Sequence, residues 1–100
     1  MKMESHGDTL CISDVTELGA VNSNALRDEA RAALTTKHRN IEIDLSQTSF
    51  LDSCGLGALI ALHKTACSRR GMVRLINPTL AVQQMLELTH LNRIFEVAKP

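Results

Sequence analysis

The sequence predicts a single α/β domain in which a small mixed, mainly parallel sheet packs against helices, in the order β-β-α-β-α-β-α-β. Three observations support this class. The chain has 100 residues, which is enough for one compact core. Short runs in which polar and apolar side chains alternate are followed by longer segments with helical periodicity. Strands that alternate with helices are usually joined by right-handed crossovers, and such strands are parallel.

The amino-terminal part predicts two strands preceded by a polar segment. Residues 1–7 are expected to form a flexible tail, so the domain itself is expected over residues 8–98. Thr9–Ser13 ("TLCIS") and Val15–Leu18 ("VTEL") both have strand-like composition, and Asp14 between them can turn the chain. We therefore expect these two strands to pair as a hairpin, whose antiparallel pairing makes the sheet mixed.

A helix and a strand are predicted next. Residues 22–38 carry apolar side chains at helical spacing, and Asn22 or Ser23 can cap the first turn of this helix. The segment Ile41–Leu45 ("IEIDL") then alternates strictly between apolar and acidic residues. This alternation is typical of a strand with one face toward a core.

The second predicted helix begins within "LDSCGLG" and ends at "SRRG". The arginines suit the negative end of the helix dipole, and Gly71 suits a left-handed stop. Apolar spacing predicts an inner face formed by Leu56, Leu59, Ile60, His63 and Cys67.

The carboxyl-terminal part predicts a strand, a helix and a last strand. Met72–Ile76 ("MVRLI") is the strand, and Asn77 and Pro78 break it and begin the helix. Arg93–Val97 ("RIFEV") is expected to close the sheet. The inner face of this helix is expected to comprise Val82, Met85, Leu86 and Thr89.

The composition excludes several classes of function. Acidic and basic residues balance at eleven each, which argues against a nucleic-acid or membrane-surface partner, and the absence of Trp and Tyr argues against base stacking. The polar amino terminus lacks the apolar core of a signal peptide, so a cytoplasmic protein is expected. Cys11, Cys54 and Cys67 are expected to be reduced thiols, and with four scattered histidines neither a metal site nor a cofactor is predicted.

The "DSCG" turn, Asp52 to Gly55, admits four interpretations. A nucleophilic Ser53 is disfavoured, because the elbow of α/β-hydrolases needs a glycine where Leu51 stands and no partner histidine can be assigned. Cys54 at a helix amino terminus could be a reactive thiol, since that position lowers a thiol's pKa. Asp52 or Ser53 could simply cap the helix.

The fourth interpretation is a phosphorylation switch at Ser53. A phosphate in the first turn of an exposed helix is tolerated by the free N–H groups and the dipole, yet it changes the charge of the surface. The two glycines nearby, Gly55 and Gly57, also need an explanation, because each costs about 1 kcal/mol relative to alanine inside a helix. Close approach of another backbone, or of a partner, would explain them.

Two segments carry a resemblance to a known family. The pattern D-L-S-x-x-x-F-x-D-S-x-G-L-G spans Asp44 to Gly57, and "LELTHLNRIFEV" closes the chain. Together with "GMVRLINPTLAVQQM" between them, these segments closely resemble the STAS domain of anti-sigma factor antagonists, over roughly residues 8–97.

The resemblance implies a protein without catalytic activity that binds an anti-sigma factor with serine kinase activity and thereby releases a sigma factor. The kinase would phosphorylate Ser53 and end the binding, and a serine phosphatase would reverse it. A monomer or weak dimer is expected, with no nucleic acid and no direct membrane insertion. Asp44 is expected to support the switch loop, which comprises Asp52, Ser53, Cys54, Gly55, Leu56 and Gly57.

Four positions depart from the family's usual pattern. Cys54 stands where the family often has Ser, Thr or Ala, which adds possible redox sensitivity. Asp14 and His90 each stand where the family usually has Gly. The segment Glu17–Gly19 ("ELG") lacks the acid that usually follows the leucine, in a region that helps contact the partner.

The alternative function keeps the fold and changes the partner. STAS domains also serve as non-catalytic subunits of lipid-transport ABC complexes and in other signalling assemblies, and such a role would not need phosphorylation of Ser53. A transporter tail is not expected, because no membrane segment precedes the domain, and a stressosome role would call for additional sensory sequence. A nucleotide-binding enzyme is disfavoured, because the sequence lacks a phosphate-binding loop and "GLGAL" lacks the third glycine of a dinucleotide site.

Overall fold

The computed structural model describes residues 1–98. Its strands are β1 (Lys2–His6), β2 (Thr9–Ser13), β3 (Glu17–Leu18), β4 (Asn40–Asp44), β5 (Phe50–Leu51), β6 (Val73–Ile76) and β7 (Glu96–Ala98). Its helices are α1 (Ser23–Ala33), α2 (Ser53–Ser68) and α3 (Leu80–Leu88), with a 3-10 turn η1 (Leu91–Arg93) before the last strand.

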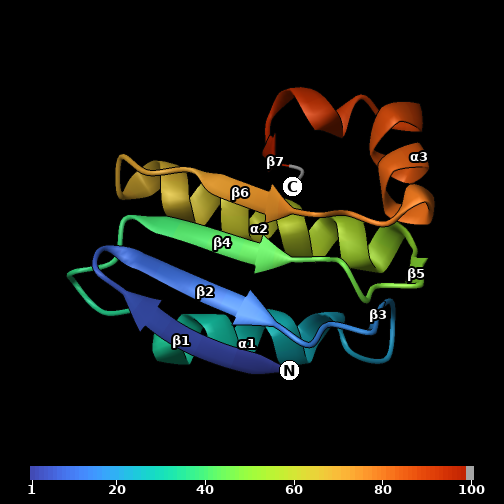
Figure 1. Ribbon diagram of the computed structural model, residues 1–100. Coiled ribbons are helices and arrows are strands. Elements are labelled where there is room, and N and C mark those ends of the chain that lie inside the picture. The colour runs from blue at the N-terminus through green and yellow to red at the C-terminus, as the bar shows by residue number, and fades with distance from the viewer. Residues whose placement is uncertain (99–100) are drawn as a thin grey trace.

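Five strands form the main sheet in the order β1-β2-β4-β6-β7, and β3 pairs with β5 in a separate two-stranded sheet. Only β1 runs antiparallel to its neighbour, and every other pairing is parallel. Figure 1 shows α1 and α2 behind the main sheet, with α3 beside β5 at the end where the central strands finish. The predicted fold class, a small mixed and mainly parallel sheet packed with helices, is confirmed.

The strand register places the apolar side chains of β2, β4 and β6 on the face that α1 and α2 cover. In this register Leu10 lies opposite Ile41, and Ile43 opposite Leu75. All four are essentially inaccessible to solvent, as are Leu26 of α1 and Leu59 of α2. The alternation read in the sequence thus arises because one face of the sheet forms the core and the other faces solvent.

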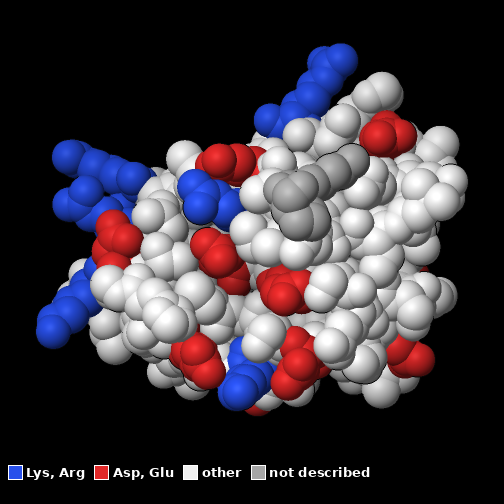
Figure 2. All heavy atoms as spheres, in the orientation of Figure 1, with Lys and Arg blue, Asp and Glu red and all other residues white. Residues whose placement is uncertain are grey.

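The uncovered face carries one polar row across all five strands, in the order Glu4, Cys11, Glu42, Arg74 and Glu96. Arg74 lies 3.7 Å from a Glu42 oxygen and 3.5 Å from a Glu96 oxygen. These pairs are exposed, so they add little to stability. Burial raises the pKa of the Cys11 thiol, and the carboxylates of Glu42 and Glu4 raise it further. Figure 2 shows acidic and basic side chains interspersed on this face.

The amino-terminal prediction was wrong in its pairing. Lys2–His6, which the sequence predicted as part of a flexible tail, forms a strand that pairs with Thr9–Ser13 through a turn at Gly7, where φ is 62°. This edge strand is polar because only Met3 packs against the core, so its sequence carries no apolar periodicity. The expected hairpin partner, Val15–Leu18, instead contributes β3, which pairs with β5.

The inner face of α2 is rotated relative to the prediction. Leu56 and Leu59 are buried as expected, but Ile60 and His63 are half-buried and Cys67 is exposed. The buried positions of this helix also include Gly55, Ala58, Leu62 and Ala66. The reason is that α2 packs against α1 as well as against the sheet, so its buried stripe faces both neighbours.

Two predictions about helix ends were also wrong. Asn22 or Ser23 was expected to cap α1, but Ser23 is already the first residue of the helix and Asn22 makes no capping hydrogen bond. The Asn22 side chain instead accepts a hydrogen bond from Gly19 N–H and donates one to the Glu17 carbonyl. At the end of α2 the left-handed residue is Arg70, with φ of 61°. Gly71 is required for a different reason: a β-carbon there would lie 1.8 Å from the Arg39 carbonyl oxygen.

The third helix and the last strand are shifted from their predicted positions. Val82 and Leu86 are buried as predicted, whereas Met85 is half-buried and Thr89 is exposed at the end of α3. Residues 91–93 form η1, so the final strand begins at Glu96. Among the helices of residues 1–98, none has the length and apolar character that crossing a membrane requires.

The structure describes the backbone at both positions where the resemblance led us to expect a glycine. Asp14 has φ of 58° and His90 has φ of 60°, so both lie in the left-handed region that favours glycine. Asp tolerates this region better than most residues, because its short side chain can form local hydrogen bonds. The strain is therefore expected to be larger at His90.

Replacing His90 with glycine is expected to raise the free energy of unfolding by roughly 0.5–1 kcal/mol, because the left-handed strain is removed at some cost in unfolded-state entropy. Urea denaturation would measure the change. His90→Ala is the matched control, since alanine keeps the β-carbon and should bring no gain. Equal stabilisation by alanine and glycine would show that the histidine ring, and not the backbone, is the source of strain.

Candidate functional site

The amino terminus of α2 is held in place by Asp52. Its Oδ1 accepts a hydrogen bond from Gly55 N–H at 3.0 Å, so Asp52, one of the two caps that the sequence allowed, is the one observed. Its Oδ2 accepts a hydrogen bond from Ala20 N–H at 3.3 Å, in the loop between β3 and α1. One carboxylate thus joins two segments that are distant in the sequence, which no local pattern predicts.

Gly55 lies where α2 crosses the backbone of β3. A β-carbon at this position would lie 2.0 Å from the Leu18 carbonyl oxygen and 2.8 Å from Leu51 Cδ1. No side chain fits at such distances. The first glycine of the motif is therefore explained by close approach within the molecule.

Gly57 differs from Gly55 because a β-carbon there would meet no heavy atom within 4 Å. The residue is exposed, so packing within the described chain does not require it. Of the six residues of the predicted switch loop, Ser53, Cys54 and Gly57 are exposed, while Gly55 and Leu56 are buried beneath them and Asp52 is half-buried. The loop therefore presents one small, accessible surface.

Ser53 occupies the first position of α2, and its side chain is free to be modified. The N–H groups of Gly55 and Leu56 already donate to Asp52. Within residues 1–98, neither the hydroxyl of Ser53 nor the N–H groups of Ser53 and Cys54 have a hydrogen-bond partner. These two N–H groups remain available to an anion at the positive end of the helix.

Two exposed apolar side chains flank this surface, and the sequence did not single them out. Val21 is 97% exposed in the loop that Asp52 holds through Ala20, and Phe50 in β5 is 50% exposed. The Phe50 ring lies against Gly19, where a β-carbon would be 2.8 Å from Phe50 Cε2. A partner that docked on this surface would gain apolar contact with both side chains.

Thr48 positions β5, and sequence reasoning missed it. It is fully buried, and its hydroxyl donates to the Val15 carbonyl. Its own carbonyl accepts a hydrogen bond of 2.6 Å from the hydroxyl of Thr79, which caps α3. Nothing in the sequence marks Thr48 as buried, because it is polar and belongs to no periodic apolar pattern.

Asp44 lies apart from the loop. Its carboxylate accepts a hydrogen bond of 2.9 Å from Ser46 N–H, in the turn that follows β4. It belongs to the uncovered face of the sheet, opposite Ile76 in the register. The Asp44 carboxylate therefore stabilises the turn that leads toward β5.

The arrangement around Ser53 does not support acid–base chemistry. In the described part of the chain, no histidine is hydrogen-bonded to Ser53, and no group of three or more potential metal-ligating side chains occurs. Cys54 is exposed beside Ser53, which keeps it accessible to oxidants. The geometry instead presents a serine on a rigid, accessible helix end.

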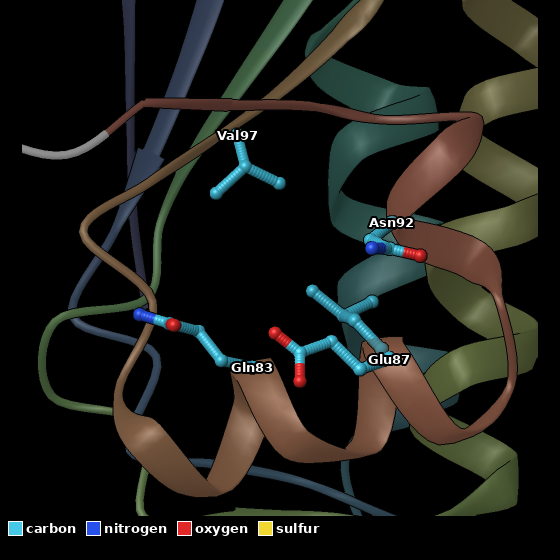
Figure 3. A pocket seen from close by; sticks show the side chains of 5 residues that line it. Gln83, Glu87, Asn92 and Val97 are labelled. Carbon is cyan, nitrogen blue, oxygen red and sulfur yellow. The ribbon is translucent and has the colours of Figure 1, made fainter.

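A pocket lies elsewhere, between α3 and the segment formed by η1 and β7. It has a volume of about 460 Å³ and is lined by Gln83, Leu86, Glu87, Asn92 and Val97. In Figure 3, Gln83 and Glu87 on α3 face Val97 across the opening, with Asn92 to one side. The Gln83 amide donates to the Pro78 carbonyl, so part of its hydrogen-bonding capacity is used within the chain.

Comparison with known families gives a match along nearly the whole chain. The STAS domain model matches residues 1–99. A curated protein from Thermotoga maritima, provisionally named an anti-sigma factor antagonist, is 31% identical over 64 residues. The matched segment makes up 64% of this chain and spans 57% of the length of that relative.

Solved structures with the same fold include proteins of similar name. A crystal structure from Thermotoga maritima, also of a provisionally named anti-sigma factor antagonist, gives a TM-score of 0.90 at 24% identity, covering 99% of this chain and 86% of that one. SpoIIAA in its unphosphorylated form gives 0.83 at 21% identity, covering 97% and 86%. The phosphorylated form of SpoIIAA, from Bacillus, gives 0.75 at 20% identity, covering 97% and 89%. At identities of 20–24%, these structural similarities show that the fold is shared.

Proposed function

Because the chain belongs to the STAS domain family, we propose that it is a non-catalytic, cytoplasmic regulator of the anti-sigma factor antagonist class. It binds an anti-sigma factor with serine kinase activity and so releases a sigma factor. Phosphorylation of Ser53 ends the binding, and a serine phosphatase restores it. The name shared by the relatives supports the general role.

The observation that carries the proposal is the accessible Ser53 at the first position of α2, beside exposed apolar residues. A partner that covers Phe50 and Val21 would also cover this hydroxyl, since both flank the same surface. A kinase can reach it in the free protein because Ser53 and Cys54 are exposed at the start of α2. The existence of a phosphorylated form of SpoIIAA, a protein with the same fold, agrees with this role.

The phosphate would act on the surface and leave the fold intact. The free N–H groups of Ser53 and Cys54 can receive its oxygens, so the added charge is tolerated in the unbound protein. In a complex the same charge would be buried without a counter-charge and next to Asp52. A penalty of about 2–5 kcal/mol follows for such a buried charge.

The test is a pull-down from a lysate of the source organism with wild type, Ser53→Ala and Ser53→Asp as baits, followed by mass spectrometry. The expected result is a small serine-kinase-like protein that binds wild type and Ser53→Ala but not Ser53→Asp. If all three baits retain the same ABC-transporter or other subunits, the phospho-switch is refuted and the alternative role within a larger assembly is favoured.

A further inference from the structure

We infer that Asp52 is a positioning residue, which holds the loop that carries Val21 in the conformation that a partner recognises. The Ser53 surface, defined as Ser53 and Cys54 with the flanking Val21 and Phe50, is built from segments distant in the sequence. In Figure 1 these segments meet at the end of the molecule where β3 and β5 lie. This role deepens the proposed function and rests on it, because it requires that a partner docks on this surface.

The loop Gly19–Asn22 is shaped by local hydrogen bonds. Gly19 N–H donates to Asn22 Oδ1 at 2.8 Å, and the Asn22 amide donates to the Glu17 carbonyl. The Gly19 carbonyl accepts hydrogen bonds from Asn22 N–H at 3.2 Å and from Ser23 N–H at 2.8 Å. These bonds set the internal shape of the loop and its entry into α1, but none of them joins the loop to α2.

Asp52 supplies the contact between this loop and the start of α2. Its Oδ2 accepts the hydrogen bond from Ala20 N–H, next to Val21, while Oδ1 accepts the one from Gly55 N–H. Within residues 1–98, no other hydrogen bond joins the loop to the segment that begins at Asp52. The position of Val21 relative to Ser53 therefore depends on one carboxylate.

Packing beneath the loop brings this carboxylate close. A β-carbon at Gly19 would lie 2.8 Å from Phe50 Cε2 and 3.0 Å from Asp52 Oδ2. Both distances are tighter than ordinary van der Waals contact, so the missing side chain at Gly19 lets the ring and the carboxylate approach the backbone. The loop, the Phe50 ring and the Asp52 carboxylate therefore pack as one unit.

The order of the loop matters for affinity because of Val21. Its side chain is 97% exposed, so it gains contact only when a partner covers it. A side chain that is already in place loses less conformational freedom on binding. If the loop were released, the partner would have to order it, at a cost that weakens binding about two- to tenfold. Asp52 can thus contribute to affinity through the loop, without touching the partner itself.

Charge and position predict opposite results when Asp52 is neutralised. If negative charge weakens docking on this surface, the loss of one negative charge would by itself strengthen binding. Asp52→Asn keeps an oxygen that can cap Gly55 N–H, but it places an amide N–H group opposite Ala20 N–H, where both groups are donors. Asp52→Ser also keeps a good cap, and its shorter side chain cannot reach Ala20 while it caps the helix. Both variants should therefore bind the partner more weakly.

The first measurement is made on the protein alone, by nuclear magnetic resonance. In Asp52→Asn and Asp52→Ser, Ala20 N–H should exchange faster with solvent than in wild type, and backbone relaxation should show larger motion at Ala20 and Val21. Gly55 N–H should stay protected, because the cap is kept. If Asp52→Asn loses the protection of Gly55 N–H, its amide has turned to the other side, and Asp52→Ser then decides.

The second measurement is isothermal titration calorimetry with the protein that wild type captures. Each variant should bind about two- to tenfold more weakly than wild type. Val21→Ala should cost less affinity in the Asp52→Asn background than in wild type, because the two changes act through the same loop. Leu88→Ala is the matched control: it removes a side chain that is 78% exposed on α3, outside the Ser53 surface, and its effect should be the same in both backgrounds.

Any of several results would overturn the proposal. These are unchanged exchange at Ala20 in both variants, a loosened loop with wild-type or stronger binding, or additive effects of Val21→Ala and Asp52→Asn. The proposed switch can fail separately. If Ser53→Asp binds as tightly as wild type while Asp52→Asn loosens the loop and weakens binding, the switch is wrong and the positioning role of Asp52 stands.

Discussion

Replacing Gly55 with alanine is expected to lower the free energy of unfolding by about 1–3 kcal/mol, the range typical of overpacked sites. The added β-carbon would lie 2.0 Å from the Leu18 carbonyl oxygen, so β3 or the first turn of α2 must move. Both segments are held by backbone hydrogen bonds, including that from Asp52 N–H to the Leu18 carbonyl at 3.2 Å. Urea denaturation of the two proteins measures the difference.

Gly57→Ala is the matched control for this prediction. The same substitution two residues further along meets no atom within 4 Å, and it should stabilise the protein by about 0.5–1 kcal/mol because alanine is the better helix former. If Gly55→Ala unfolds at the same urea concentration as wild type, α2 does not lie against β3 as described. Weaker partner binding by the stable Gly57→Ala protein would indicate that the partner approaches the helix at this glycine.

Placing a negative charge at Ser53 is expected to weaken binding of the partner by about thirty-fold to several thousand-fold. This range corresponds to about 2–5 kcal/mol for a charge buried at an interface without compensation. Phosphorylated protein should show the full effect and Ser53→Asp a smaller one, because the phosphate carries nearly two charges at pH 7. Isothermal titration calorimetry with the captured partner gives the dissociation constants.

Ser68→Asp is the matched control for the charge. Ser68 is exposed and lies at the other end of the same helix, so this variant carries the same net charge as Ser53→Asp but places it away from the Ser53 surface. Its dissociation constant should remain within a few-fold of wild type. Equal weakening by both variants would show a general charge effect, and no weakening by Ser53→Asp or by the phosphate would refute the switch.

Much of the main sheet could be predicted from the sequence, because its central strands form a buried layer. The segments "TLCIS", "IEIDL" and "MVRLI" have one face on the core, and a strand is observed within each of them. Edge strand β1 and the two-residue strands β3 and β5 could not be predicted in the same way. Their pairing depends on the approach of neighbouring segments, since they bury too few side chains to produce a periodic pattern.

The candidate site, like the sheet, could be predicted from the sequence only in part. The sequence offered Asp52 or Ser53 as the cap of the second helix, and Asp52 is the one observed; capping is a local interaction between residues three apart, so the sequence can indicate it. It did not predict that the same carboxylate accepts a hydrogen bond from Ala20 N–H, or that Thr48 links the segment before β5 to the start of α3. These contacts join distant parts of the chain, and they depend on how the elements pack.

The sequence by itself determined the fold class, the family and the position of Ser53 at a helix amino terminus, because periodicity, capping and a dense motif are all short-range features. Only the tertiary structure decided which glycine of the motif is required by packing and which apolar side chains flank Ser53. Gly55 is needed because the β3 backbone passes within contact distance, and Val21 and Phe50 stay exposed although both are apolar. Such close approaches follow from the packing of whole elements, which the local order of residues does not specify.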